Sequence, residues 1–330
     1  MTSITSDLKV AVVGCGYAGR CHAHAYSITL GVKLVAVCDI QPAAAEKAAT
    51  AFGVTAYTSF EAMLAKEKPD VVSIATRESN HEIPVIHALE SGAAVFCEKI
   101  MADTVQAGER MVAAARRTEG MLAVNYNYRT LPGFAAIKAR LASGATGAVP
   151  LAVAQTHAYL WHHMLDMLRF YFGDALEVSA TLKGNPEDTP YDWRGQDEML
   201  YIPSLAASAT FRFSSGAVAT LAATKHTSFD RHLMEISLYG ENERIQLVDI
   251  TPANTCGRFI DGPLVDALRT TPAVTLDQSF DLSIAAFVKA LRAGDPPPAT
   301  GEDGLRVLYM ENAVVRAARE NRTVKIQNAL

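Results

Sequence analysis

Residues 9–20, KVAVVGCGYAGR, decide the fold of the first part of the chain. Residues 10–13 are β-branched and small apolar residues, which predict a buried strand, and residues 17–30 predict a helix. Between them lies a GxGxxG motif. Its first glycine allows a tight turn, its second lets the backbone approach a pyrophosphate, and its third allows close packing of helix on strand. In this strand–turn–helix context the motif predicts a dinucleotide-binding site.

A second predicted strand, residues 33–38, ends at Asp39, which lies 20 residues after the last glycine of the motif. A carboxylate at this spacing accepts hydrogen bonds from the ribose hydroxyls of the adenosine and repels a 2′-phosphate. The following residues, Ile40, Gln41 and Pro42, offer no positive charge that would hold such a phosphate. The sequence therefore favours NAD over NADP as the cofactor.

Length and composition limit the other possibilities. A chain of 330 residues is long enough for two domains, and its net charge of −5 gives no bulk attraction for nucleic acid or an anionic membrane surface. No apolar run is long enough to span a bilayer, and no signal-peptide core precedes the first strand. The five cysteines lack metal-type spacing, which indicates buried free thiols in a reducing cytoplasm. We expect a cytoplasmic protein.

The first third of the chain alternates apolar strands with amphipathic helices, which predicts a parallel, doubly wound sheet. Ligands of such sheets bind beyond the carboxyl ends of the strands. These predicted strand ends are where the chemistry is expected, and they carry Gly14, Asp39, Thr76, Glu98, Lys99 and Asn125.

The pattern changes after Tyr128. Two pairs of alternating segments, 205–213 with 217–225 and 233–239 with 244–248, are joined by short turns that predict hairpins. Successive hairpins indicate an antiparallel sheet, whose core we expect two C-terminal helices to close. The predicted fold is α/β, with a Rossmann NAD(P)-binding domain over residues 1–126 and an α+β domain over residues 127–330. The latter would contain a large, open, mostly antiparallel sheet that binds substrate and supports oligomerisation.

Several segments together resemble the glucose–fructose oxidoreductase / inositol dehydrogenase (Gfo/Idh/MocA) family along essentially the whole chain. The matching segments are GCGYAG, the acid Asp39, ATRESNH (75–81), SGAAVFCEK (91–99), VNYNYR (124–129), HHMLDMLRFYFG (162–173) and PPATGEDGLRVLYMENAVVRAARENRTV (297–324). The resemblance implies a Rossmann domain followed by an open α+β sheet. It also implies an NAD(P)-dependent dehydrogenase or reductase acting on the CH–OH groups of a small molecule such as a sugar or cyclitol, in a homodimer or homotetramer formed through the C-terminal sheet.

The resemblance also implies site residues. Those expected at the cofactor are Gly14, Gly16, Tyr17, Ala18, Gly19, Asp39, Ile40, Thr76, Asn80, His81, Glu98, Lys99 and Asn127. Those expected at the substrate are Lys99, Tyr128, Arg129, Trp161, His162 and His163.

Four residues are candidates for catalysis. Lys99 would hydrogen-bond the reacting oxygen and stabilise developing alkoxide charge, and His163 would exchange the hydroxyl proton. Asp166, three residues later on the same predicted helix face, would orient the imidazole, although His162 is an alternative acid–base. Tyr159 stands where the family commonly has an aspartate, so it either replaces that acid or forms an aromatic wall of the substrate pocket.

Two further departures from the family pattern concern the same region. Ile100 follows Lys99 where the family has a proline, and the segment 147–163 is short. Three other interpretations stay open. One is an enzyme that oxidises hemiacetals of aromatic ring-cleavage semialdehydes, with Arg129 holding a carboxylate. Another is a non-catalytic NAD(P)-binding regulator. The third is a metal site, for which the candidate ligands are His157, His162, His163 and Asp166, although we expect no metal.

Overall fold

The computed structural model describes residues 7–183, 206–225 and 228–327. The chain divides into two compact units. The first comprises Met1–Asn127 and Phe280–Leu305, and the second comprises Tyr128–Ser279 and Arg306–Leu330.

The first unit is built on a six-stranded sheet whose neighbouring strands are all parallel. Its strand order, β3-β2-β1-β4-β5-β6, is that of a dinucleotide-binding fold. The predicted doubly wound sheet is confirmed. The strands are β1 (Leu8–Val13), β2 (Val32–Cys38), β3 (Thr55–Tyr57), β4 (Val71–Ile74), β5 (Ala94–Cys97) and β6 (Leu122–Val124).

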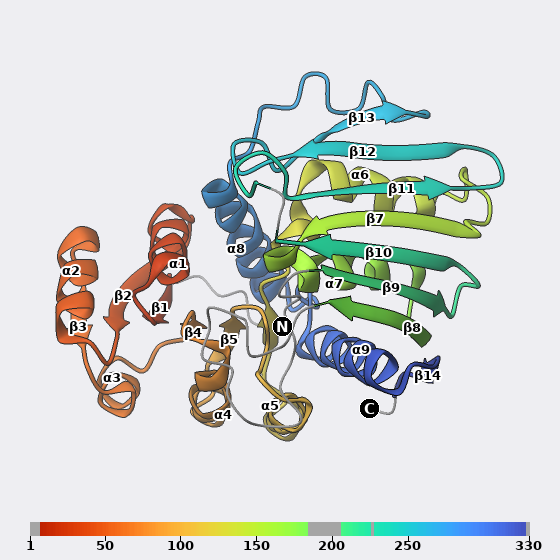
Figure 1. The fold of residues 1–330 in the computed structure, drawn as a ribbon. Helices are drawn as coiled ribbons and strands as arrows, with labels where there is room; N and C mark the ends of the chain where they lie inside the picture. The colour runs from red at the N-terminus through yellow and green to blue at the C-terminus, as the bar shows by residue number, and fades with distance from the viewer. Residues whose placement is uncertain (1–6, 184–205, 226–227, 328–330) are drawn as a thin grey trace. The chain divides into compact units, whose positions relative to one another are not determined.

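Helices connect these strands and begin and end where local chemistry allows (Figure 1). Proline occupies the first turn of α2, which ends at Gly53 with φ +66°. The hydroxyls of Ser59 and Thr104 accept backbone hydrogen bonds at the starts of α3 and α5. The elements are α1 (Tyr17–Ile28), α2 (Pro42–Phe52), α3 (Phe60–Glu67), the 3₁₀ turn η1 (Glu78–Asn80), α4 (Glu82–Glu90) and α5 (Val105–Thr118).

Helix α8 (Leu276–Ala293) packs mainly in the first unit. Its residues Ile284, Phe287 and Val288 are buried in one hydrophobic cluster with residues of β1, β2 and α1. Arg292 at its end donates a hydrogen bond to the carbonyl of Gly31. This packing differs from the expectation that both C-terminal helices close the second domain, because an apolar helix face does not specify which sheet it covers.

The second unit is built on an eight-stranded sheet with the order β13-β12-β11-β7-β10-β9-β8-β14. Neighbouring strands are antiparallel except for β7 and β10, and both predicted hairpins are present. The expectation of a large, mostly antiparallel sheet is confirmed. The strands are β7 (Leu151–His157), β8 (Ala175–Lys183), β9 (Ala206–Phe213), β10 (Val218–Thr224), β11 (Met234–Tyr239), β12 (Arg244–Ile250), β13 (Arg258–Asp261) and β14 (Val324–Lys325).

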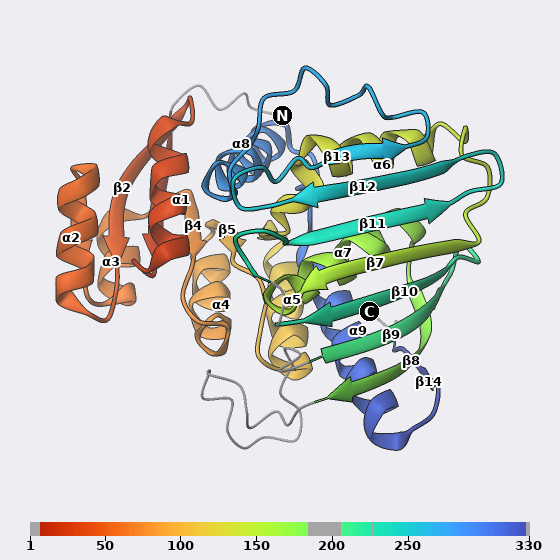
Figure 2. The ribbon, with the colours of Figure 1, turned by 45° about the horizontal axis from the view of Figure 1, so that its top comes forward.

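Helices cover one face of this sheet, as Figure 2 shows for α6 (Pro132–Ala142), α7 (Trp161–Phe172) and α9 (Gly301–Glu320). Side chains along β7 alternate between the covered and the uncovered face. Ala152 and Ala154 are buried, whereas Leu151 and Val153 are exposed. Two short 3₁₀ turns, η2 (Asn127–Thr130) and η3 (Ala158–Leu160), precede α6 and α7. Among the described helices, none is long and apolar enough to cross a membrane.

Candidate active site

The glycine turn has the geometry that a dinucleotide site requires. Gly14 has φ +91°, and a Cβ atom there would lie 2.4 Å from the carbonyl oxygen of Ala75. A Cβ atom on Gly19 would lie 1.8 Å from the carbonyl oxygen of Gly14, so this glycine allows close helix–strand packing. A Cβ atom on Gly16 would meet no protein atom within 4 Å. The space at Gly16 is therefore open, which fits the close approach of a pyrophosphate.

The start of α1 also suits an anion. Gly16 is its N-cap and offers no side-chain acceptor, and no acidic residue occupies the first turn, which begins with Tyr17 and Ala18. The backbone N–H groups of this first turn and the helix dipole favour a phosphate at this position.

Asp39 is held at the end of β2 by two backbone donors. Its Oδ2 accepts from the N–H of Cys15 at 2.8 Å, and its Oδ1 accepts from the N–H of Gln41 at 2.9 Å. The carboxylate is thus fixed beside the glycine turn, where it would accept hydrogen bonds from ribose hydroxyls. Ile40 next to it is 82% exposed and offers an apolar surface for an adenine ring.

The loop after β4 contains three predicted cofactor residues. The Thr76 hydroxyl lies 3.3 Å from the carbonyl oxygens of Arg77 and Asn80. The His81 ring is fully buried, with Nε2 3.1 Å from the carbonyl of Thr76 and Nδ1 3.1 Å from that of Ile100. His81 therefore ties this loop to the segment that follows Lys99. Its predicted contact with the cofactor stays a prediction.

Glu98 is the centre of a buried polar network. Its Oε1 accepts from His22 Nε2 at 2.9 Å and from Asn125 Nδ2 at 2.5 Å. Since a carboxylate only accepts, His22 Nε2 donates to Glu98, and His22 Nδ1 lies 2.8 Å from the Ser73 hydroxyl oxygen. Ser283 of α8 donates to Asn125 Oδ1 at 2.6 Å. Burial raises the pKa of Glu98, but the hydrogen bonds and charges around it prevail and hold it below its ordinary value.

Lys99 follows this network directly and is half-buried. Burial lowers the pKa of its ammonium, while the negative charges of Glu98 and Glu78 oppose that shift. The peptide bond from Lys99 to Ile100 is cis. The network thus anchors the backbone that carries a desolvated lysine at the end of β5. Asn127, another predicted cofactor residue, is buried just after β6.

The catalytic candidates of the second unit lie on α7. The His163 ring is buried and lies 4.8 Å from the ring of Tyr128, centroid to centroid. Asp166 accepts from both Nε and Nη2 of Arg129, at 2.8 and 2.6 Å. The Arg129 guanidinium also lies over the Phe170 ring. This buried bidentate pair engages both the carboxylate predicted to orient His163 and the arginine predicted to hold a substrate carboxylate.

The preceding residues on α7 face a buried acid of α9. Trp161 Nε1 donates to Glu311 Oε2 at 2.5 Å, and His162 Nδ1 lies 3.7 Å from the same oxygen. All three side chains are buried. Trp161 is thus hydrogen-bonded to Glu311, and the His162 ring lies near the same buried carboxylate. His163 is one step around the helix and packs against Tyr128 instead, which makes it the better acid–base candidate.

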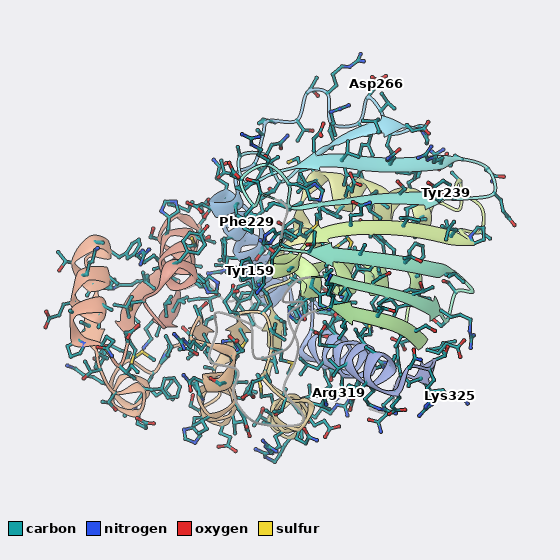
Figure 3. All side chains as sticks on the ribbon, in the orientation of Figure 1. Tyr159, Phe229, Tyr239, Asp266, Arg319 and Lys325 are labelled. Atoms are coloured by element: carbon teal, nitrogen blue, oxygen red, sulfur yellow. The ribbon has the colours of Figure 1, made fainter. Side chains whose placement is uncertain are left out.

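Tyr159 belongs to an aromatic cluster at the end of β7. Its ring stacks on His157 at 5.2 Å, and Phe229 packs edge-on against His157 at 5.1 Å. The ammonium of Lys225 lies 5.5 Å from the centre of the Tyr159 ring. Figure 3 shows Tyr159 and Phe229 at the same end of the eight-stranded sheet.

The sequence interpretation missed several of these residues. His22 lies in α1 shortly after the glycine motif, but no local sequence pattern marks it as a partner of Glu98. Glu311 is one of several acids in α9, and nothing in the sequence shows that it is the buried one. Lys225 ends a predicted strand and belongs to no recognisable motif. Within the described residues, no group of three or more histidine, cysteine or acidic side chains is arranged to hold a metal ion.

Comparison with known proteins agrees with this geometry. Residues 8–126 match the Gfo/Idh/MocA oxidoreductase family in its NAD-binding Rossmann fold, and residues 160–326 match its C-terminal alpha/beta domain.

Individual proteins are similar along nearly the full chain. D-apiose dehydrogenase of Paraburkholderia graminis is 27% identical, with 99% of this chain and 92% of that protein covered. Inositol 2-dehydrogenase of Rhizobium meliloti is 27% identical, with 97% and 99% covered. A solved structure of levoglucosan dehydrogenase with NADH and L-sorbose has a TM-score of 0.83 at 20% identity, with 98% and 100% covered. The chain therefore belongs to the Gfo/Idh/MocA family of oxidoreductases, with that family's NAD-binding Rossmann fold and C-terminal alpha/beta domain.

Proposed function

We propose that the protein transfers hydride between nicotinamide and a hydroxyl or carbonyl carbon of a sugar or cyclitol. The names of the similar D-apiose and inositol dehydrogenases support a polyol substrate. NAD, when bound, supplies the hydride acceptor, and the residues of this chain supply positioning and proton transfer. The glycine turn and Asp39 would hold its pyrophosphate and ribose.

The observation that carries the proposal is the environment of Lys99. Its half-buried ammonium follows a fixed network at the end of a Rossmann strand, and burial lowers its pKa. A positioned, desolvated ammonium stabilises an alkoxide more strongly than a hydrated one. Lys99 would donate a hydrogen bond to the substrate oxygen as negative charge develops there.

His163 would take the hydroxyl proton as hydride leaves, or return it in reduction. Its ring is held against Tyr128, while the Arg129–Asp166 pair fixes the next turn of α7. We assign Tyr159 to the wall of the substrate pocket rather than to proton transfer, because its ring is stacked on His157.

The test is nicotinamide absorbance during incubation of the protein with NAD and a panel of sugars and cyclitols, followed by the Lys99→Met variant on the substrate that responds. We expect turnover by the wild type and a loss of 10²-fold or more in kcat for the variant, a size typical of losing a transition-state donor. NADH affinity, measured by fluorescence, should change little. NADH binding without turnover of any panel member would instead favour a regulatory protein.

Two further proposals concern the cellular compartment and the oligomeric state. All five cysteines are free thiols and four are buried, which supports a reducing cytoplasm as the working compartment. The uncovered face of the eight-stranded sheet supports a homodimer or homotetramer formed through that face.

A further inference from the structure

The ends of β7 and β10 bring together a group of residues of which the mechanism above uses only Tyr159, as a wall of the substrate pocket. These strands are parallel neighbours, and Thr224 of β10 pairs with His157 of β7. Lys225 therefore follows β10 beside the point where β7 ends. Phe229 completes the group, with its ring edge-on to His157 and 6.4 Å from Tyr159.

The positive charge of this cluster is carried by Lys225. Burial lowers the pKa of His157, and the nearby charges of His232 and Lys225 lower it further. Burial also lowers the pKa of Lys225. Asp230, the nearest acid in sequence, accepts a hydrogen bond from the Ser228 hydroxyl. In the described part of the chain, no carboxylate forms an ion pair with Lys225.

Two other half-buried lysines donate hydrogen bonds from their ammonium groups to backbone carbonyls. Lys9 donates to the carbonyl of Glu67 at 2.7 Å, and Lys138 donates to the carbonyl of Phe170 at 2.5 Å. The ammonium of Lys225 has the face of Tyr159 as its contact among the described residues. A partly desolvated cation without a hydrogen-bonded acceptor is costly, and an anionic ligand would remove that cost.

We propose that the substrate carries an anionic group, a carboxylate or a phosphate monoester, which Lys225 holds at the end of β10. Tyr159 and Phe229 would cover the apolar face of its carbon skeleton, as aromatic side chains do in sites with few polar contacts. This inference rests on the proposed function, because it assigns the substrate class of the same site. Lys225 and the aromatic pair are then specificity residues, distinct from Lys99 and His163.

Matched substrates test this assignment. Steady-state kinetics with NAD would compare glucose, glucuronate and glucose 6-phosphate, and galactose with galacturonate. Thermal shift with NADH would measure binding of the same five compounds without turnover. We expect the KM of at least one anionic compound to be at least tenfold lower than that of its neutral partner. Comparing the sugar acids with the sugar phosphate shows whether the site prefers a carboxylate or a phosphate monoester.

Variants assign the selectivity to the residue. Lys225→Met should remove the preference for the anionic compound while changing the KM of the neutral partner less than about threefold, and Lys225→Arg should retain part of it. Lys138→Met, which removes another half-buried lysine over an aromatic ring, should leave the ratio of the two KM values unchanged.

The outcomes separate the two proposals. Turnover of neutral sugars without any Lys225-dependent preference would overturn the inference and leave the proposed function standing. Lys225-dependent stabilisation by an anionic compound, without turnover, would support the inference and count against the proposed function. Absence of Lys225-dependent binding by every anionic compound would also overturn the inference.

Discussion

Burial and the neighbouring negative charges have opposite effects on the pKa of Lys99. Burial lowers the pKa of Lys99, and the negative charge of Glu98 raises it, followed in size by that of Glu78. Glu98 remains ionised because His22 and Asn125 hydrogen-bond to it. The carboxylate thus preserves the protonated lysine that the proposed chemistry needs, in a position where desolvation alone favours its neutral form.

This balance predicts a pH dependence. In the proposed mechanism the protonated lysine is the active form, so activity should fall as pH rises through the pKa of Lys99. Glu98→Gln removes a charge that raises this pKa, and the alkaline limb of kcat/KM should therefore move to lower pH. Glu78→Gln should move it in the same direction by less, and Glu90→Gln, which changes an exposed acid elsewhere, should leave it in place. A limb that stays fixed or moves to higher pH in Glu98→Gln would show that Lys99 does not control it.

At the scale of the element, the turn from β1 to α1 separates the role of a glycine in folding from its role in binding. Gly14 has a positive φ and no room for a Cβ atom, whereas Gly16 has φ −68° and open space. Alanine fits the conformation of Gly16 without strain, but its methyl group would occupy the space that the pyrophosphate approaches.

We therefore predict opposite outcomes for two matched variants. Gly14→Ala should destabilise the protein by about 1–3 kcal/mol or more, seen as a lower melting temperature without cofactor. Gly16→Ala should melt near the wild-type temperature but bind NADH at least tenfold more weakly in a fluorescence titration. A Gly16→Ala protein with unchanged NADH affinity would contradict the assignment of this turn to the cofactor.

The same scale shows what the sequence can predict. Glycine spacing, apolar alternation and proline positions are local signals, and they identify α1, α2, the parallel sheet and both hairpins correctly. Strand β8 was missed, although Val178, Ala180 and Leu182 alternate with polar residues along it. The packing of α8 was also missed, because which sheet an apolar helix covers depends on contacts remote in sequence.

The site divides in the same way. Asp39 and the glycine turn are predicted from spacing alone, and the structure brings them together through the hydrogen bond from the N–H of Cys15 to Asp39. The Arg129–Asp166 pair, the Trp161–Glu311 hydrogen bond and the Lys225 cluster join residues from different elements. No periodicity or motif in the chain encodes those contacts, so they emerge only from the fold.

At the scale of the whole molecule, the open sheet face concerns assembly. Leu151, Val153 and Tyr239 lie exposed on neighbouring strands, with Thr220 and Ser237 paired to Val153 in register. Helices cover the opposite face, so the exposed apolar side chains are available to a second copy of the chain.

We predict that Val153→Glu lowers the mass of the assembly in size-exclusion chromatography with light scattering, because it places charge in the centre of this face. Ile28→Glu, at a 56% exposed position of α1, should leave the mass unchanged. A wild type that is monomeric at all concentrations, or a Val153→Glu protein of unchanged mass, would rule out the face as the interface.

The reaction proposed for this chain is NAD-dependent hydride transfer with His163 as the acid–base. The most direct measurement compares kcat for His163→Asn and His162→Asn on the same substrate, with NADH affinity as the control. We predict a loss of about 10²–10⁴-fold for His163→Asn, the usual contribution of a general acid–base, and less than tenfold for His162→Asn, with NADH affinity retained in both. Near-normal kcat in His163→Asn, or a greater loss in His162→Asn, would rule out His163 as the acid–base.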